Sequence, residues 1–146
     1  MSNAVSNNYN GEIDIVLNHK SYPMTINMDV IAKFESKTGQ DFMCLAIRSM
    51  NALRKTASMD ATDQAETMTT AVSMSHAAWL FYIAANESDK VVTFDEMQEN
   101  VLYEGPLQQV SLDENGGASL VNRSYPILFT QLVMFAVLGV ADEAKK

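Results

Sequence analysis

The chain has 146 residues, of which 47% are hydrophobic and 19% are charged, and its formal net charge is −8 at pH 7. This length suits a single domain, and the apolar content is sufficient for a hydrophobic core. The acidic charge argues against nucleic-acid binding, because phosphate contacts need clustered Lys and Arg. The only basic group, Arg48, Arg54 and Lys55, is too sparse for that role. We expect a soluble cytoplasmic protein whose acidic surface suits basic protein partners.

The first eleven residues are polar and predict a flexible N-terminus without the basic and apolar regions of a signal peptide. Cys44 is the only cysteine, so the chain can form no internal disulfide, which is typical of a reducing compartment. A nucleophilic Cys44 would need a neighbouring base and an electropositive setting, and the sequence supplies neither nearby. We therefore expect a buried structural thiol.

Residues 12–28 predict a β-hairpin, because apolar residues alternate with other residues on both sides of a polar turn. The turn is expected at Asn18–Ser21. Pro23 suits an edge strand, since proline cannot donate to a neighbouring strand. One face of the hairpin is apolar and requires a covering element, for which a helix is the natural candidate.

Three helices are predicted next. Asp29 is expected to cap the first, which runs to about Thr38 and ends at Gly39, a residue suited to a left-handed C-cap. Asp41 is expected to cap the second. The third follows Asp60 and extends to about Asn86 as one helix. Its apolar stripe is Met68, Val72, Trp79 and Ile83.

The second half of the chain begins with a capping-box pattern at Thr93 and Glu96, which predicts a helix that stops at Gly105-Pro106. Residues 107–112 favour a strand, and residues 113–117 form a strong turn signal. A C-terminal helix is expected over about residues 125–141. The fold class is therefore α+β, with an N-terminal β-hairpin packed on a mainly α-helical body in a single domain over residues 12–141.

The C-terminal helix is unusual because it has no lasting polar face. Thr130, Gln131 and Gly139 are its only interruptions between residues 127 and 141. Such a helix is buried on all sides, lies in a membrane, or contacts a partner. It is short for a membrane span, which needs about 20 apolar residues. A partner or a second copy is favoured, because a terminal helix of a small domain is hard to bury fully.

Candidate catalytic residues are few. His19 falls in the predicted turn, and His76 lies on the apolar stripe, where a core histidine with one hydrogen bond is the favoured interpretation. Glu35 projects away from the predicted stripe of Ile31 and Phe34, so we expect it to be solvated. The residues supply no zinc-ligand spacing, phosphate loop or nucleophile motif, and no metal or cofactor is expected.

Three segments together resemble a known family: "VIAKFESKTG" after the hairpin, the aromatic helix "AAWLFYIAAN", and "VTFDEMQENVLYEG". In their order over residues 12–105 they resemble the tail assembly chaperones of long-tailed, siphovirus-type bacteriophages. The resemblance implies a non-enzymatic protein that coats the tape measure protein and helps to recruit tail tube subunits during tail morphogenesis. It also implies self-association and a location in the host cell cytoplasm.

The leading hypothesis is thus an assembly chaperone that binds its partner through the apolar C-terminal helix. A structural tail component retained in the virion, such as a tail completion or tube-associated protein, is the alternative. A small enzyme using Glu35 with His19 or His76 is a distant third. The expected partner-binding residues are Phe129, Met134, Phe135 and Leu138.

Overall fold

The structure is a computed structural model that describes residues 12–106, 109–112, 115, 118–121 and 124–145. The predicted flexible segment 1–11 and most of the predicted turn at 113–117 lie outside the described residues. A β-hairpin followed by a mainly helical body confirms the α+β fold class. The single-domain assignment over residues 12–141 stays a prediction.

Strands β1 (Glu12–Leu17) and β2 (Lys20–Thr25) form the antiparallel hairpin, with Leu17 opposite Lys20. The turn is shorter than expected and consists of Asn18 and His19 alone, with φ angles of 52° and 68°. Two consecutive positive φ angles match a type I′ turn, whose twist suits a two-residue hairpin. The other two residues of the predicted turn, Lys20 and Ser21, therefore belong to β2.

Helix α2 (Met28–Thr38) begins two residues earlier than the sequence suggested. Its N-cap is Asn27, whose side-chain oxygen accepts from the N–H of Val30 at 2.9 Å. The expected cap, Asp29, lies inside the first turn and forms an ion pair with Lys33. Both residue types are good caps, so composition alone could not separate them. Gly39 ends the helix with a φ of 70°, as predicted.

Asp41 caps α3 (Phe42–Lys55) as predicted, accepting from the N–H of Cys44 at 2.8 Å. A short 3-10 turn, η1 (Thr56–Ser58), follows it. The predicted third helix is wrong as a single element. It is divided into α4 (Ala61–Ala71) and α5 (Met74–Ala85), because Val72 is extended and the Ser73 side chain caps α5 by accepting from His76.

The Thr93–Glu96 capping box opens α6 (Phe94–Glu104), and Gly105 closes it with a φ of 73°. Both features were predicted. Strands β3 (Gln109–Leu112) and β4 (Ala118–Val121) form a second antiparallel pair. Helix α7 (Tyr125–Lys145) completes the chain and extends beyond the predicted end near residue 141.

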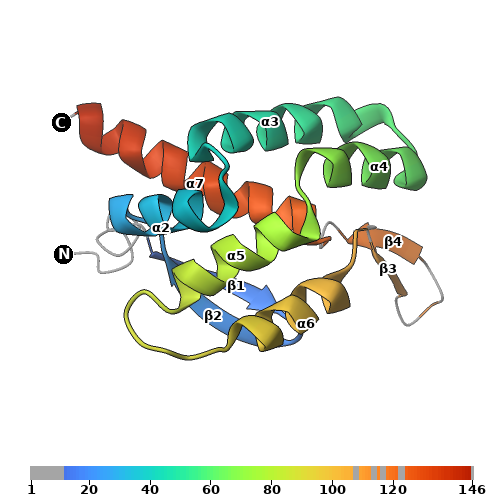
Figure 1. Ribbon diagram of the computed structural model, residues 1–146. Helices are drawn as coiled ribbons and strands as arrows, with labels where there is room; N and C mark the ends of the chain where they lie inside the picture. The colour runs from blue at the N-terminus through green and yellow to red at the C-terminus, as the bar shows by residue number, and fades with distance from the viewer. Residues whose placement is uncertain (1–11, 107–108, 113–114, 116–117, 122–123, 146) are drawn as a thin grey trace.

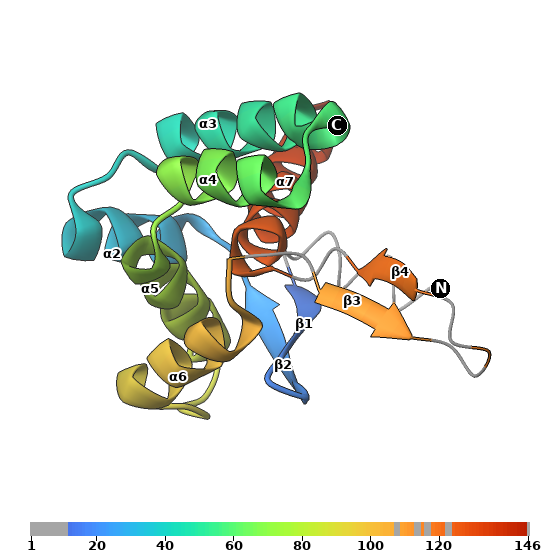
Figure 2. The ribbon, with the colours of Figure 1, turned by 90° about the vertical axis from the view of Figure 1, so that its right-hand side faces the viewer.

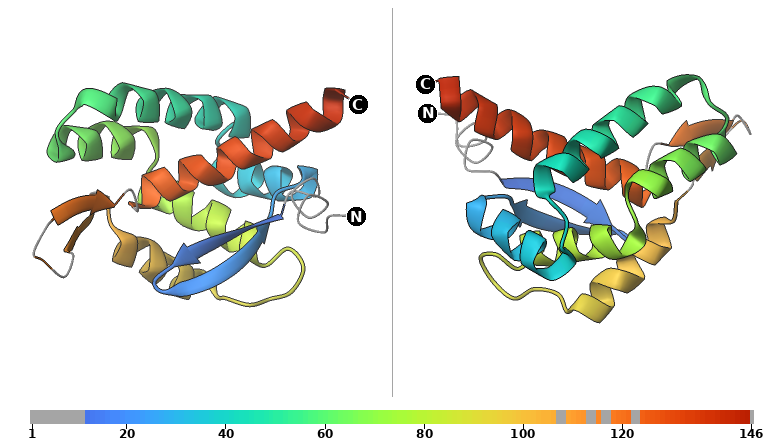
Figure 3. Two further views of the ribbon diagram at one scale, coloured as in Figure 1. Left: turned by 180° about the vertical axis from the view of Figure 1, so that it is seen from behind. Right: turned by 45° about the horizontal axis from the view of Figure 1, so that its top comes forward.

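Helix α5 lies at the centre of the molecule (Figure 1). It contacts α2, α6, α7 and β2, while α3 and α4 lie side by side along one edge and α6 along the opposite edge (Figures 1 and 2). The hairpin and α7 share the rear of the molecule (Figure 3). The side chains that fill the core and are exposed by less than 2% include Phe34, Phe81, Phe129, Leu17, Met24, Leu45, Leu80, Met97 and Leu132.

Candidate functional site

Helix α7 is attached to the body at its first residue. The backbone N–H of Tyr125 donates to the carbonyl oxygen of Gly105 at 2.8 Å, and its hydroxyl donates to the carbonyl oxygen of Val72 at 3.0 Å. Burial raises the pKa of Tyr125 to about 12. The buried apolar side chains described for this helix include Tyr125, Ile127, Leu128, Phe129, Leu132, Val133 and Ala136.

The four predicted partner-binding residues divide into three groups. Phe129 has an exposed fraction of 0% and packs against Phe81, with ring centroids 6.4 Å apart, so its assignment to a binding surface is wrong. Met134 and Phe135 lie at the boundary of the core and are partly exposed. The side chain of Leu138 lies outside the described residues. Among the three side chains that the structure describes, the accessible ones are therefore Met134 and Phe135.

Helix α3, which packs beside α7, exposes two further apolar residues that the sequence analysis did not single out. Met43 is 48% exposed and Ile47 is 52% exposed. The buried residues of α3 include Phe42 and Leu45, and Met43 and Ile47 fall out of phase with them. This phase difference, together with the i, i+4 spacing of the pair, is the sequence signal that could have revealed them.

The charged residues of α3 are all basic. Arg48, Arg54 and Lys55 are exposed on this helix, which contains no acidic residue. Within the described part of the chain, none of the three takes part in an ion pair, and Arg54 donates only to the side chain of Asn51, at 2.6 Å. The sparse basic group of the sequence is thus concentrated on one helix.

Cys44 is exposed at the start of α3, so the expectation of a buried thiol is wrong. It follows two residues after Phe42, whose side chain turns into the core and leaves position 44 facing outward. Hydrogen bonding and the negative charge of Asp41 raise the pKa of the Cys44 thiol. A raised pKa disfavours the nucleophilic thiolate.

Glu35 has a structural partner that the sequence did not reveal. One of its carboxylate oxygens accepts from the backbone N–H of Phe42 at 2.8 Å, so it links α2 to the first turn of α3. It is also partly buried, which corrects the expectation of a solvated side chain. The exposed N–H groups of a helix N-terminus favour such a negative partner.

The two histidines lie in separate environments. His19 is hydrogen-bonded to the hydroxyl of Tyr103 on α6. His76 is only partly buried near the start of α5, and burial, followed by the positive charge of Arg48, lowers its pKa. Among the described residues, no hydrogen bond joins Glu35 to either histidine. The structure therefore does not bring together the residues of the enzyme hypothesis.

The hairpin turn and α6 share a buried polar network that sequence reasoning missed. The backbone N–H of Asn18 donates to Glu104 at 2.7 Å, and the Asn18 side chain donates to Asn100 at 3.2 Å. Asn100 in turn donates to the hydroxyl of Tyr22 at 2.9 Å. Glu104 and Asn100 are 3% and 7% exposed. These bonds join residues about 80 positions apart, so the network holds the hairpin on α6.

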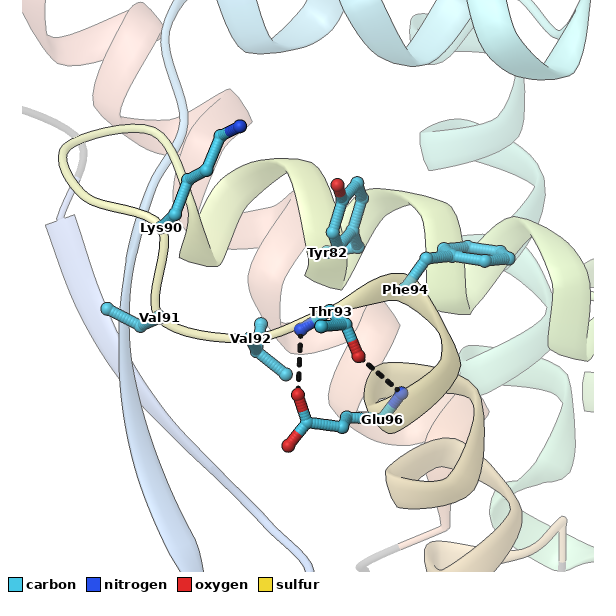
Figure 4. Close-up of a pocket in the computed structure, with 7 residues that line it drawn as sticks. All are labelled: Tyr82, Lys90, Val91, Val92, Thr93, Phe94 and Glu96. Carbon is cyan, nitrogen blue, oxygen red and sulfur yellow. Dashed lines mark hydrogen bonds between the residues drawn. The ribbon is translucent and has the colours of Figure 1, made fainter.

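A hollow of about 390 Å³ lies where the loop after α5 meets the start of α6 (Figure 4). Lys90, Thr93 and Glu96 line it, and the last two already satisfy one another through the capping box. Its aromatic side is packed, because Phe94 stacks on Trp79 with centroids 4.0 Å apart and meets Tyr82 edge-on. The side chains around the hollow therefore pack the start of α6. They do not form an arrangement of catalytic groups.

In the part of the chain that the structure describes, no group of three or more His, Cys, Asp or Glu is placed to hold a metal ion. No helix in this part is long and apolar enough to cross a membrane. No known protein family, curated protein or solved structure matches the chain.

Proposed function

We propose that this protein is a non-enzymatic chaperone of bacteriophage tail assembly, which binds the tape measure protein and helps tail tube subunits to gather on it. The observation that carries the proposal is the surface formed by Met134 and Phe135 on α7. These residues remain partly exposed on a helix whose other described side chains are mostly buried. The identity of the partner, and the host cytoplasm as the place of action, follow from the resemblance of the sequence.

The chemistry of the surface supports a partner with apolar segments. Methionine is flexible and polarizable, so it adapts to irregular partner surfaces, and an adjacent aromatic ring provides a large contact area. The resemblance implies that the tape measure protein is long and prone to aggregation before tail subunits cover it. A chaperone that meets such segments requires adaptable contacts more than one shaped pocket.

The test is co-expression with the tape measure protein encoded in the same genome, followed by measurement of how much of it stays in solution. Replacing Phe135→Asp should return the tape measure protein to the insoluble fraction, because a charge is placed in the apolar contact. Gln131→Asp is the matched control, since Gln131 is exposed one turn earlier on the same helix. Circular dichroism must show that both variants are folded.

Phe135→Ser is a milder substitution at the same position, and it provides the test if Phe135→Asp is unfolded. If Phe135→Asp and Phe135→Ser both keep the tape measure protein soluble, or if both are unfolded, α7 is not the binding surface. The alternative, a structural tail component, predicts copies of the chain in purified particles. A chaperone is expected to be missing from them, and mass spectrometry of purified virions distinguishes the two.

A further inference from the structure

Helix α3 carries an apolar stripe on its outer side, and the stripe ends in a cation. Four residues recur at spacings of three or four and therefore lie along one side of the helix. They are Met43, Ile47, Met50 and Arg54. Met43 and Ile47 are about half exposed, Met50 is partly buried and Arg54 is exposed. The core-facing residues of α3, such as Leu45, lie on the other side of the helix.

Positive charge flanks this stripe. Arg48 and Lys55 are exposed beside it, and α3 contains no acidic residue. In the described part of the chain, neither they nor Arg54 form an ion pair, even though the adjacent helix α4 carries Asp63 and Glu66. Cations in the last turn of a helix stabilise its negative end, which accounts for Arg54 and Lys55 but not for Arg48 in the middle of α3.

The pattern defines the chemistry of a molecule that would cover it. Exposed apolar side chains at helical spacing favour the apolar side of another helix, because the side chains of two helices fit between one another. Cations beside those side chains favour carboxylates in the second helix and repel Lys and Arg. The matching occupant is therefore a helix with an apolar stripe flanked by Asp or Glu.

We propose that the outer side of α3 is a docking surface for an acidic amphipathic helix of another protein. Met43 and Ile47 pack against the apolar residues of that helix. Arg48, Arg54 and Lys55 bind its carboxylates, which fixes the position of the helix along α3 and excludes basic segments of equal hydrophobicity.

Two other occupants match the surface less well. The most acidic helix of a second copy is α6, where the hydroxyl of Tyr103 is already hydrogen-bonded to His19 and the other exposed apolar residue is Leu102. A single free apolar residue is a poor partner for a stripe. A nucleic acid matches the cations alone, since it has no apolar side for Met43 and Ile47, and the chain's net charge of −8 repels it.

This surface is separate from the one proposed on α7, since neither Met134 nor Phe135 belongs to it. Loss of one contact therefore leaves the other in place, and the partner of α3 need not be the tape measure protein. Salt should weaken the α3 contact, because exposed charges are screened beyond about 8 Å at physiological ionic strength and beyond about 3 Å at 1 M.

Cys44 makes a direct test possible, because it is exposed on α3 and is the only cysteine in the chain. A helix bound to α3 should shield the thiol, so binding is measured as slower alkylation of Cys44 by iodoacetamide. The probe is a synthetic peptide of about 18 residues, or five helical turns, with leucine at every third or fourth position and glutamate on both sides of that stripe. The same peptide with lysine in place of glutamate is the charge control.

The acidic peptide should slow alkylation about tenfold when its concentration is about ten times its dissociation constant, because about a tenth of the surface is then free. The lysine peptide should leave the rate unchanged. Raising the salt concentration to about 1 M should restore much of the original rate. Phe135→Ser on α7 should be protected as the original chain is.

Charge reversal at the end of the stripe identifies the surface. Arg54→Glu should raise the dissociation constant of the acidic peptide at least about tenfold, because like charges then meet. Lys90→Glu is the matched control, since it makes the same change in net charge on the exposed loop before α6. Arg48 is left in place, because its positive charge partly offsets the rise in the Cys44 pKa caused by Asp41.

Ile47 and Leu102 provide an apolar comparison, since they are 52% and 66% exposed. Ile47→Ser should weaken binding of the acidic peptide, and Leu102→Ser on α6 should not. If circular dichroism shows Arg54→Glu to be unfolded, this pair provides the test.

The proposal is overturned if the acidic peptide does not protect Cys44, or if the lysine peptide protects it equally well. It is also overturned if folded Arg54→Glu, or Ile47→Ser, binds the acidic peptide as the original chain does. Protection of Cys44 in the protein alone, increasing with its concentration, would show that a second copy covers α3 and would likewise overturn it.

Discussion

Helices α5 and α7 are alike in sequence, since both are apolar with little polar face. They differ in how their side chains are covered by neighbouring elements. Helix α5 is enclosed by α2, α6, α7 and β2, and its partly exposed Trp79 is covered by Phe94 and by the ammonium of Lys37, 5.5 Å from its ring centroid. Helix α7 contacts α3, α4, α5, α6 and β1, yet among its described side chains Gln131 is exposed and Met134, Phe135 and Val137 stay partly exposed. Apolar composition therefore does not identify a binding surface, because the neighbouring elements decide what stays exposed.

The sharpest way to test this difference is to remove one aromatic ring from each side of α7. Phe129→Ala should lower the free energy of unfolding by about 3–5 kcal/mol, because it leaves a cavity in the core. Phe135→Ala should lower it by less than half as much, since this ring is already partly exposed. Urea denaturation measures both values. Equal losses would show that the two sides of α7 are equally buried.

A smaller effect is expected where α7 joins the body. Tyr125→Phe removes the hydroxyl that donates to Val72, the residue separating α4 from α5, and should cost about 1 kcal/mol. Because burial raises the pKa of Tyr125 from 10.0 to about 12, its phenol stays protonated in the folded protein while the unfolded chain ionises. This part of the stability is complete below pH 10 and is lost as the pH rises to about 12.

The phenylalanine variant should lack that loss, so its stability should change less between pH 10 and 12 than that of the original chain. Absorbance titration of the phenols gives an independent measurement. If every tyrosine of the folded protein ionised near pH 10, the start of α7 would be open to solvent.

The smallest effect concerns the exposed start of α5. The pKa of His76 is lowered by burial and by Arg48, so the unfolded chain takes up a proton at a higher pH than the folded one. The stability that His76 provides is present above its ordinary pKa of 6.5 and is lost as the pH falls below it. An NMR titration should show a midpoint below 6.5, and Arg48→Ala should move it upward. An unchanged midpoint in this variant would contradict the influence of Arg48.

Local sequence signals predicted much of the fold. Gly39, Asp41, Thr93 and Gly105 each perform the capping role expected of them, because a cap depends on a few neighbouring residues. The break between α4 and α5 was missed because the helical periodicity of the apolar stripe continues across Val72. The available signal was Ser73, a polar residue suited to an N-cap, inside this long periodic stretch.

The candidate site was harder to predict, since it depends on which elements pack together. Phe129 and Phe135 are both apolar residues of one helix, and only the position of α5 decides that one of them is buried. Glu35 gains its partner from α3 seven residues away, which no helical pattern indicates.

The hydrogen bond from Asn18 to Glu104 spans 86 residues, which has a consequence for synthesis on the ribosome. The hairpin emerges first, and at roughly 5–20 residues per second its anchor on α6 follows only after several seconds. During this interval the apolar face that carries Leu17 and Met24 lacks the part of its cover that α6 provides, although α5, which also contacts β2, is made earlier. The nascent chain is therefore most vulnerable to aggregation before its last third is made, and slowing translation there should lower the yield of folded protein.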